Sequence, residues 1–108
     1  MKFILALVSA TFVGGSVLAS TDSCSQWQRE DYQSAIGVVA THLNYSKAEL
    51  CSLARLADIH VTKRSFLNAD QMPEMHTWVT LHYNEDSCQY FVRDSDLVIT
   101  RSNCYNTF

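Results

Sequence analysis

The spacing of apolar residues changes once along the chain, near Asp58, and no other feature limits the fold as strongly. Before Asp58, apolar residues recur at the three- and four-residue intervals typical of an amphipathic helix. After it, apolar and polar residues alternate, as they do in a strand with one buried face. A chain with helices first and strands afterwards is expected to form an α+β domain.

The first helix is predicted over Gln26–Leu43, with Ser25 and Gln28 as a capping box at its start. Gly37 lies inside this helix and weakens it, which suggests that another element approaches closely there. The apolar positions of the helix are Trp27, Tyr32, Ala35, Ile36, Val39 and Leu43.

The second helix is predicted over Lys47–Ala57, and its start is the clearest local signal in the chain. Ser46 is the expected N-cap, and Glu49 completes the capping box. The short link to the first helix predicts an antiparallel helical hairpin. The apolar stripe of the second helix is Leu50, Leu53, Ala54 and Ala57.

Four strands are predicted after the helices. Their short connections favour an antiparallel meander, and the two N-terminal helices are expected to pack on one face of that four-stranded sheet. Asp94 and Ser95 are expected to form a two-residue turn between the last two strands. The predicted strands are Ile59–Phe66, Met75–Tyr83, Cys88–Arg93 and Asp96–Ser102.

The N-terminus has the pattern of a secretory signal peptide. Lys2 gives it a positive charge, Phe3–Val13 is almost entirely apolar, and Val17–Ala19 suits the cleavage position. Gly14–Ser16 interrupts the apolar run too early for a membrane-spanning helix. Residues 1–19 are therefore the predicted signal peptide. Residues 20–108 are the predicted mature domain, secreted and without a membrane anchor.

All four cysteines lie in the predicted mature domain, at Cys24, Cys51, Cys88 and Cys104. An even number in an exported chain of this size predicts two disulfides. No two cysteines are close in sequence, which disfavours a zinc site, so no metal is expected.

The predicted elements also suggest which cysteines pair. In a helical hairpin, Cys24 and Cys51 would lie too far apart to bond. With a two-residue turn at Asp94, Cys88 would face Arg101 and not Cys104. The predicted disulfides are therefore Cys24–Cys104 and Cys51–Cys88.

One face of the predicted sheet should point away from the helices and carry aromatic, basic and histidine side chains. A hairpin around the loop Asn68–Glu74 would place His60 opposite His82. Exposed aromatic rings beside arginine are common in protein interfaces, and the alternative is an ordinary solvated face. The candidate interaction face contains His60, Thr62, Arg64, His76, Trp78, Thr80, His82, Gln89, Phe91 and Arg93.

Other signals for chemistry are sparse. The histidine pair lacks an accompanying carboxylate or nucleophile in the strand interiors, so no catalytic residue is predicted and no cofactor is expected. With 11 acidic and 8 basic residues, the formal net charge is −3, and no basic run predicts a nucleic-acid partner. His42 should complement the dipole at the end of the first helix. Asn44-Tyr45-Ser46 is a sequon that predicts possible N-glycosylation of Asn44.

The signal Met1–Ala10, the short mature domain and the paired cysteines resemble the small secreted effectors of plant-associated filamentous fungi. The segment Phe91–Arg101 is similar to the last hairpin of fungal guanyl-specific ribonucleases and their inactive effector relatives. The enzymes have a catalytic histidine after the Ile-Thr pair, where this chain has Arg101. Their strand glutamate has no evident match here, so the resemblance implies binding and not catalysis.

The resemblance implies a secreted effector that binds a host protein, without catalysis, and so promotes virulence or suppresses host defence. Extracellular localisation is expected, with delivery into host tissue left open. Two alternatives remain. One is an extracellular or periplasmic inhibitor or immunity protein, and the other is a small RNase-like hydrolase.

Overall fold

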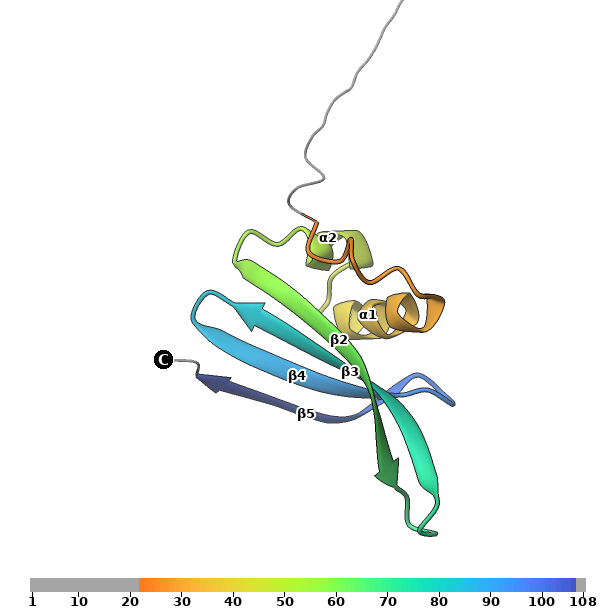
Figure 1. Ribbon diagram of the computed structural model, residues 1–108. Coiled ribbons are helices and arrows are strands. Elements are labelled where there is room, and N and C mark those ends of the chain that lie inside the picture. Colours follow the sequence, from red (N-terminus) through yellow and green to blue (C-terminus); the bar gives the residue numbers. More distant parts are fainter. Residues whose placement is uncertain (1–21, 107–108) are drawn as a thin grey trace, which may run out of the picture.

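The computed structural model describes residues 22–106, so the predicted signal peptide lies outside the described residues (Figure 1). The described chain folds as two helices followed by four strands. In chain order the elements are α1 (Glu30–His42), α2 (Lys47–Cys51), β2 (Leu56–Leu67), β3 (Pro73–Tyr83), β4 (Asp86–Arg93) and β5 (Val98–Asn106).

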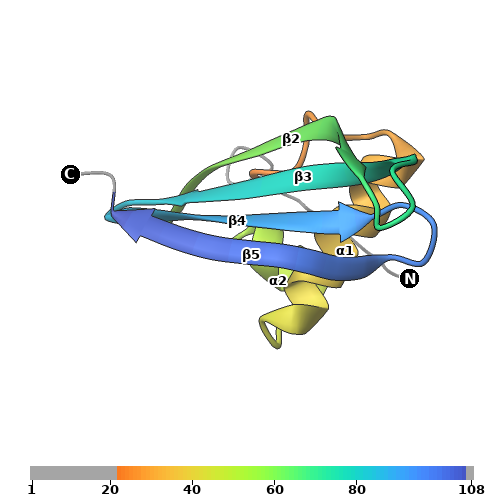
Figure 2. The same ribbon diagram turned by 90° about the horizontal axis from the view of Figure 1, so that it is seen from below.

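The strands form one antiparallel sheet in the order β2-β3-β4-β5, as the meander predicts. Helix α1 crosses β3, β4 and β5, while α2 packs against α1. Both helices lie on the same side of the sheet (Figure 1), and no helix covers its other side, which faces the viewer in Figure 2. We call this uncovered side the outer face. The core between the layers contains Ala35, Ile36, Val39, Ala40, Leu50, Ile59, Val61, Val79, Leu81, Tyr90 and Val92.

Helix α1 begins at Glu30, later than predicted, and its N-cap is Arg29 with no side-chain cap. The predicted capping box at Ser25 is wrong, because the Gln28 side chain donates to the Ser25 carbonyl instead. Trp27 explains the late start: its indole Nε1 donates to the backbone oxygen of Ile59, 2.9 Å away, and so joins the preceding segment to strand β2. Gly37 has open space around it, so no element approaches there.

Helix α2 begins with the predicted capping box. The Ser46 hydroxyl accepts from the Glu49 amide, and the Glu49 carboxylate accepts from the Ser46 amide. The helix ends at Cys51, well before the predicted end, since the Ser52 hydroxyl donates to the Ala48 carbonyl at the C-terminus. Ala54 and Ala57 of the predicted stripe are therefore exposed, outside the helix.

The β2–β3 register differs from the predicted one by two residues, which leaves every side chain on its predicted face. His60 lies opposite Thr80, and His82 lies opposite Asp58. The difference arises in the connecting loop, where the Asn68 side chain accepts from the amides of Asp70 and Met72. The strands therefore extend to Leu67 and Pro73, and the hairpin projects beyond the rest of the sheet (Figure 1).

The β4–β5 register differs from the predicted one by three residues. The turn is longer than Asp94–Ser95, because Arg93 pairs with Val98, and Leu97 adopts a left-handed conformation with φ 57°. A bulge then leaves Thr100 without a partner between the pairs Val92–Ile99 and Phe91–Arg101. Together the longer turn and the bulge place Cys104 directly opposite Cys88.

The disulfides are Cys24–Cys51 and Cys88–Cys104, so the predicted pairing is wrong. The short helix α2 ends at Cys51, and the Ser23 amide donates to the Cys51 carbonyl across 2.8 Å. The segment before α1 therefore lies beside the end of α2, in place of the distant position that a long helical hairpin would give it. Two disulfides are compatible with an extracellular protein. No helix in the described part of the chain combines the length and apolar character that crossing a bilayer requires.

Candidate interaction face

Three aromatic rings from adjacent strands contact one another on the outer face. Trp78 of β3 stacks on Phe91 of β4, with ring centroids 5.2 Å apart. Phe66 of β2 meets Phe91 edge to face at 5.2 Å. All three residues are half-buried, although no helix covers them. The outer face thus has a small apolar layer of its own.

Two arginines lie over these rings. The guanidinium of Arg101 lies 4.4 Å from the centroid of Phe66, and that of Arg64 lies 5.4 Å from the centroid of Trp78. Both arginines are exposed, and neither forms an ion pair with any residue from 22 to 106. We define Arg64, Phe66, Trp78, Phe91 and Arg101 as the aromatic–arginine cluster. The cluster presents two positive charges without carboxylate partners, on an aromatic base.

The indole nitrogen of Trp78 is buried and has no hydrogen-bond partner within the described chain. A buried donor without an acceptor costs about 1–3 kcal/mol, so native structures rarely contain one without a reason. Arg64, which is exposed, lies over the same ring.

His76 lies next to the cluster but is only 3% exposed. Its Nδ1 lies 3.1 Å from the Glu74 carbonyl, and its Nε2 lies 2.9 Å from the Thr100 hydroxyl. Because the carbonyl can only accept, Nδ1 donates, and in the neutral ring Nε2 accepts from Thr100. Both nitrogens are occupied, so His76 supports Phe66, whose ring it contacts at 5.0 Å, and does not face a ligand.

Other predicted members of the face lie outside the cluster. His60 is exposed and contacts the Trp27 ring at 5.4 Å, near the edge of the sheet. His82 Nδ1 lies 2.9 Å from the Ser87 hydroxyl, which is 1% exposed and therefore out of reach of a substrate. The predicted His60–His82 pair does not form, because the register places Thr80 opposite His60. Thr62 and Gln89 are half-buried, and Thr80 is buried.

Arg93 is on the predicted face, but its charge is already paired. It binds both carboxylate oxygens of Asp96 at 2.9 and 2.8 Å, and it lies 3.7 Å from Glu74. The hydrogen bond to Asp96 raises the pKa of Arg93, and the same bond lowers the pKa of Asp96. Arg93 therefore forms the rim of the face, where a partner finds less unpaired charge than at Arg64 or Arg101.

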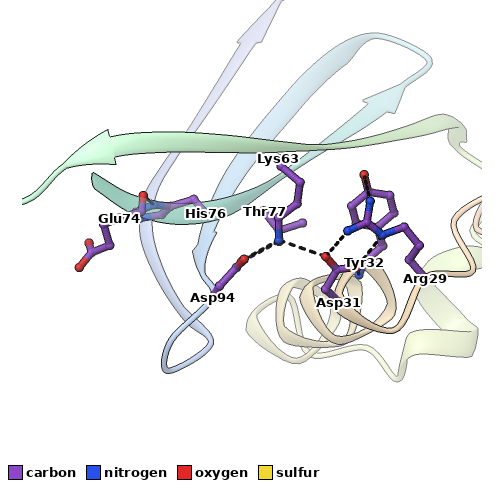
Figure 3. A network of polar contacts seen from close by, with 8 residues as sticks. All are labelled: Arg29, Asp31, Tyr32, Lys63, Glu74, His76, Thr77 and Asp94. Carbon is purple, nitrogen blue, oxygen red and sulfur yellow. Dashed lines mark hydrogen bonds and ion pairs between the residues drawn. The ribbon is translucent and has the colours of Figure 1, made fainter. Parts of the chain in front are cut away.

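The helix side of the sheet contains a separate polar network centred on Lys63 (Figure 3). Its amine forms ion pairs with Asp94 of the β4–β5 turn and with Asp31 of α1, and it donates to the Thr77 hydroxyl at 2.9 Å. Arg29 also pairs with Asp31, at 2.8 Å. The network therefore connects helix α1 to β2, β3 and the β4–β5 turn, and we assign it a structural role.

Charge pairing shifts the pKa values of Asp31 and Lys63 in this network. Burial alone would raise the pKa of Asp31, but hydrogen bonds from Lys63 and Arg29 outweigh burial and lower it. Burial alone would lower the pKa of Lys63, but hydrogen bonds to Asp94 and Asp31 outweigh burial and raise it. Both groups therefore favour their charged forms.

Two further predicted features have clear positions. Asn44 is exposed between the helices with φ 68°, so a glycan there would meet no packed element. His42 is the last residue of α1, and its ring contacts Tyr90 at 5.8 Å. Asp22, Cys24 and Cys51 bring potential ligand atoms within 4.8 Å, but both sulfurs are joined in a disulfide and are not thiolates.

Sequence reasoning missed Phe66, Thr100 and Arg101. Phe66 alternates with Arg64 along one strand, so the strand period could have placed it on the outer face. Arg101 reaches that face opposite Phe91 only because of the bulge at Thr100, which has no signal in the sequence.

Comparison of the chain with protein-family models, with curated proteins and with solved structures found no match.

Proposed function

We propose that this chain is a secreted protein that acts by binding another protein through the aromatic–arginine cluster, and not by catalysis. The observation that supports this most directly is the pair Arg64 and Arg101, two exposed guanidinium groups on an aromatic base that form no ion pair with the carboxylates of residues 22–106. Tryptophan and arginine are among the residues that most often contribute the largest share of binding energy in protein interfaces.

The chemistry of the cluster favours a partner with carboxylates and apolar groups. An arginine recognises a carboxylate through two parallel hydrogen bonds, and the rings beneath it exclude water. The chain's net charge of −3 disfavours a polyanion such as RNA as the main partner.

The biological role that we propose follows from the resemblance to small secreted effectors. The partner is a host protein, and binding promotes virulence or suppresses host defence. The two disulfides suit a protein that works outside the cytosol.

The test compares two arginines in matched environments. Arg101 lies 4.4 Å from the Phe66 ring inside the cluster, and Arg55 lies 4.5 Å from the Tyr83 ring outside it. Residues 20–108 with oxidised cysteines are immobilised and exposed to host extracellular proteins, and bound proteins are quantified by mass spectrometry. A partner lost with Arg101→Gln but retained with Arg55→Gln supports the proposal.

An RNA-cleavage assay on the same preparations tests the hydrolase alternative. Cleavage that follows the folded protein through purification, together with capture that is equal for the two arginine variants, would refute binding through the cluster as the function.

A further inference from the structure

Strand β5 forms one edge of the sheet, and we propose that this edge binds an extended segment of the partner as a fifth strand. The segment that fits has side chains that alternate between acidic and apolar. This inference rests on the proposed function in one respect, that the partner is a protein. Strands that add to an exposed sheet edge gain affinity from backbone hydrogen bonds and specificity from pockets for alternate side chains.

The edge is open within the described chain. Strand β5 is last in the sheet order and pairs with β4 alone. All its residues except Ile99 are exposed, and within residues 22–106 the backbone of 98–104 forms no backbone–backbone hydrogen bond outside its pairing with β4. The Asp96 carboxylate accepts from the Val98 amide at the start of the strand. By contrast, the Trp27 indole binds the Ile59 carbonyl of β2, at the opposite edge.

The backbone of β5 presents hydrogen-bonding groups to this edge at identifiable residues. The Cα atoms of Cys88 and Cys104 are 4.0 Å apart, the close spacing of a non-hydrogen-bonded pair in an antiparallel sheet. The N–H and C=O groups of Cys104 therefore point away from β4. The pattern repeats every second residue, so those of Ser102 point to the open edge as well.

Two hollows lie beside β5, one on each side of the sheet. The hollow on the helix side has a volume of about 490 Å³ and is lined by Val38, Thr41 and His42 of α1 with Ile99, Thr100, Arg101 and Ser102 of β5. The hollow on the outer face has a volume of about 300 Å³ and is lined by Gln89, Phe91, Arg101, Ser102 and Asn103. Successive side chains of an added strand point to opposite faces, and so toward these two hollows in turn.

The linings determine the side chains that fit. On the outer face Arg101 offers a charge without an ion-pair partner among residues 22–106, which favours a carboxylate. On the helix side Val38 and Ile99 are half-buried apolar groups, which favour an apolar side chain. A second copy of the chain fits less well, because Val98–Asn106 contains no Asp or Glu to face Arg101.

The experiment uses two fluorescein-labelled ten-residue peptides, one alternating Glu with Val and the other alternating Lys with Val. Fluorescence anisotropy with the disulfide-bonded chain should show binding of the Glu–Val peptide only. Ser102→Pro removes the outward N–H at an edge position where proline is tolerated. It should weaken binding about tenfold, the effect of losing one net hydrogen bond. Ser102→Ala keeps the N–H and should weaken binding much less than Ser102→Pro does.

A second measurement needs no variant and so does not depend on how Ser102→Pro folds. Hydrogen exchange at the amides of Ser102 and Cys104 in the unaltered chain should slow when the Glu–Val peptide is added. No binding at concentrations on the order of 1 mM, no slowing at these amides, or equal binding of the Lys–Val peptide would overturn the inference. Self-association in sedimentation experiments that Ser102→Pro abolishes would also overturn it, in favour of a second copy.

These outcomes are separable from the failure of the proposed function. Partner capture that is lost with Arg101→Gln but unchanged with Ser102→Pro leaves the cluster as a binding surface and removes only the added strand.

Discussion

The imidazole of His76 and the hydroxyl of Thr100 lie 2.9 Å apart, Nε2 to Oγ1, although 24 residues separate them in the chain. His76 belongs to β3 and Thr100 to β5, so this hydrogen bond crosses the intervening strand β4. Thr100 is the unpaired residue of the bulge, and the bulge brings Arg101 opposite Phe91. The hydrogen bond therefore connects a buried histidine to the geometry of the aromatic–arginine cluster.

Thr100→Val should destabilise the protein by about 1–3 kcal/mol, because it leaves Nε2 of the buried His76 without a partner. Valine has nearly the same size as threonine, so the change isolates the lost hydrogen bond. Urea unfolding monitored by tryptophan fluorescence measures the change. Thr100→Ser retains the hydroxyl and should stay much closer to the unaltered chain. Equal stability of the valine and serine variants would mean that water replaces the hydroxyl.

Lys63→Met should lower the free energy of unfolding at pH 7 by roughly 1–2 kcal/mol, because it leaves Asp31 and Asp94 without their shared cation. The folded-state pKa of Asp31 is depressed, so its pairing stabilises above its ordinary value of 3.8 and is lost as the pH falls through the lower folded value. The difference in the free energy of unfolding between Lys63→Met and the unaltered chain should therefore become smaller below about pH 4.

Alkaline conditions test the other partner in the same network. The pKa of Lys63 is raised, so its contribution is complete below the ordinary value of 10.5 and is lost as the pH rises through the raised value. Urea titrations at pH 3, 7 and above 11 measure all three conditions. Lys47→Met is the control and should show little pH-dependent difference, because the Lys47 amine donates to the uncharged Gln33 side chain at 2.7 Å and forms no ion pair within residues 22–106.

Mass spectrometry of a non-reduced digest should recover one peptide pair joining Cys24 to Cys51 and another joining Cys88 to Cys104. Removing the second bridge with Cys88→Ala and Cys104→Ala should cost about 3 kcal/mol, as expected for a separation of 16 residues. A peptide joining Cys51 to Cys88 would contradict the β4–β5 register.

His60→Ala and His82→Ala should each leave partner binding within about twofold of the unaltered chain, since neither residue belongs to the aromatic–arginine cluster. Surface plasmon resonance with the captured partner gives the comparison, and circular dichroism checks the fold. A folded His60→Ala or His82→Ala variant that has lost its biological activity would revive the enzyme hypothesis.

N-terminal sequencing of secreted material should find Ser20 or Thr21 as the first residue, because Val17–Ala19 is the predicted cleavage region. Retention of Met1 in the extracellular protein would contradict the predicted signal peptide.

Features that depend on residues a few positions apart could be predicted from the sequence. The capping box of Ser46 and Glu49 needs only a three-residue spacing, and the alternation along β3 correctly buries Thr77, Val79 and Leu81. The α+β arrangement follows from these local patterns. The side chains of β2 and β3 lie on their predicted faces although the predicted register was wrong, because an error of two residues preserves side-chain direction.

Features that depend on turn geometry could not be predicted in the same way. Leucine rarely adopts the left-handed conformation, so nothing in the sequence indicates that Leu97 would lengthen the β4–β5 turn. The bulge at Thr100 adds one more residue of displacement. The partner of Cys88 and the position of Arg101 both depend on these two irregularities. For this reason the predicted pairing of Cys88 and Cys104 was wrong, and Arg101 was not predicted as part of the aromatic–arginine cluster.

The two disulfides close sequence separations of 27 and 16 residues, and neither connects the helical segment to the sheet. A protease that cut the chain once between Ser52 and Arg55 would divide it into two polypeptides, each with its own disulfide. Core packing, the Trp27–Ile59 hydrogen bond, the Lys63–Asp31 ion pair and the ring contacts Trp27–His60 and His42–Tyr90 would hold them together. Each half of the molecule is therefore cross-linked separately. The two fragments, produced apart and each with its own disulfide, should reassemble by complementation.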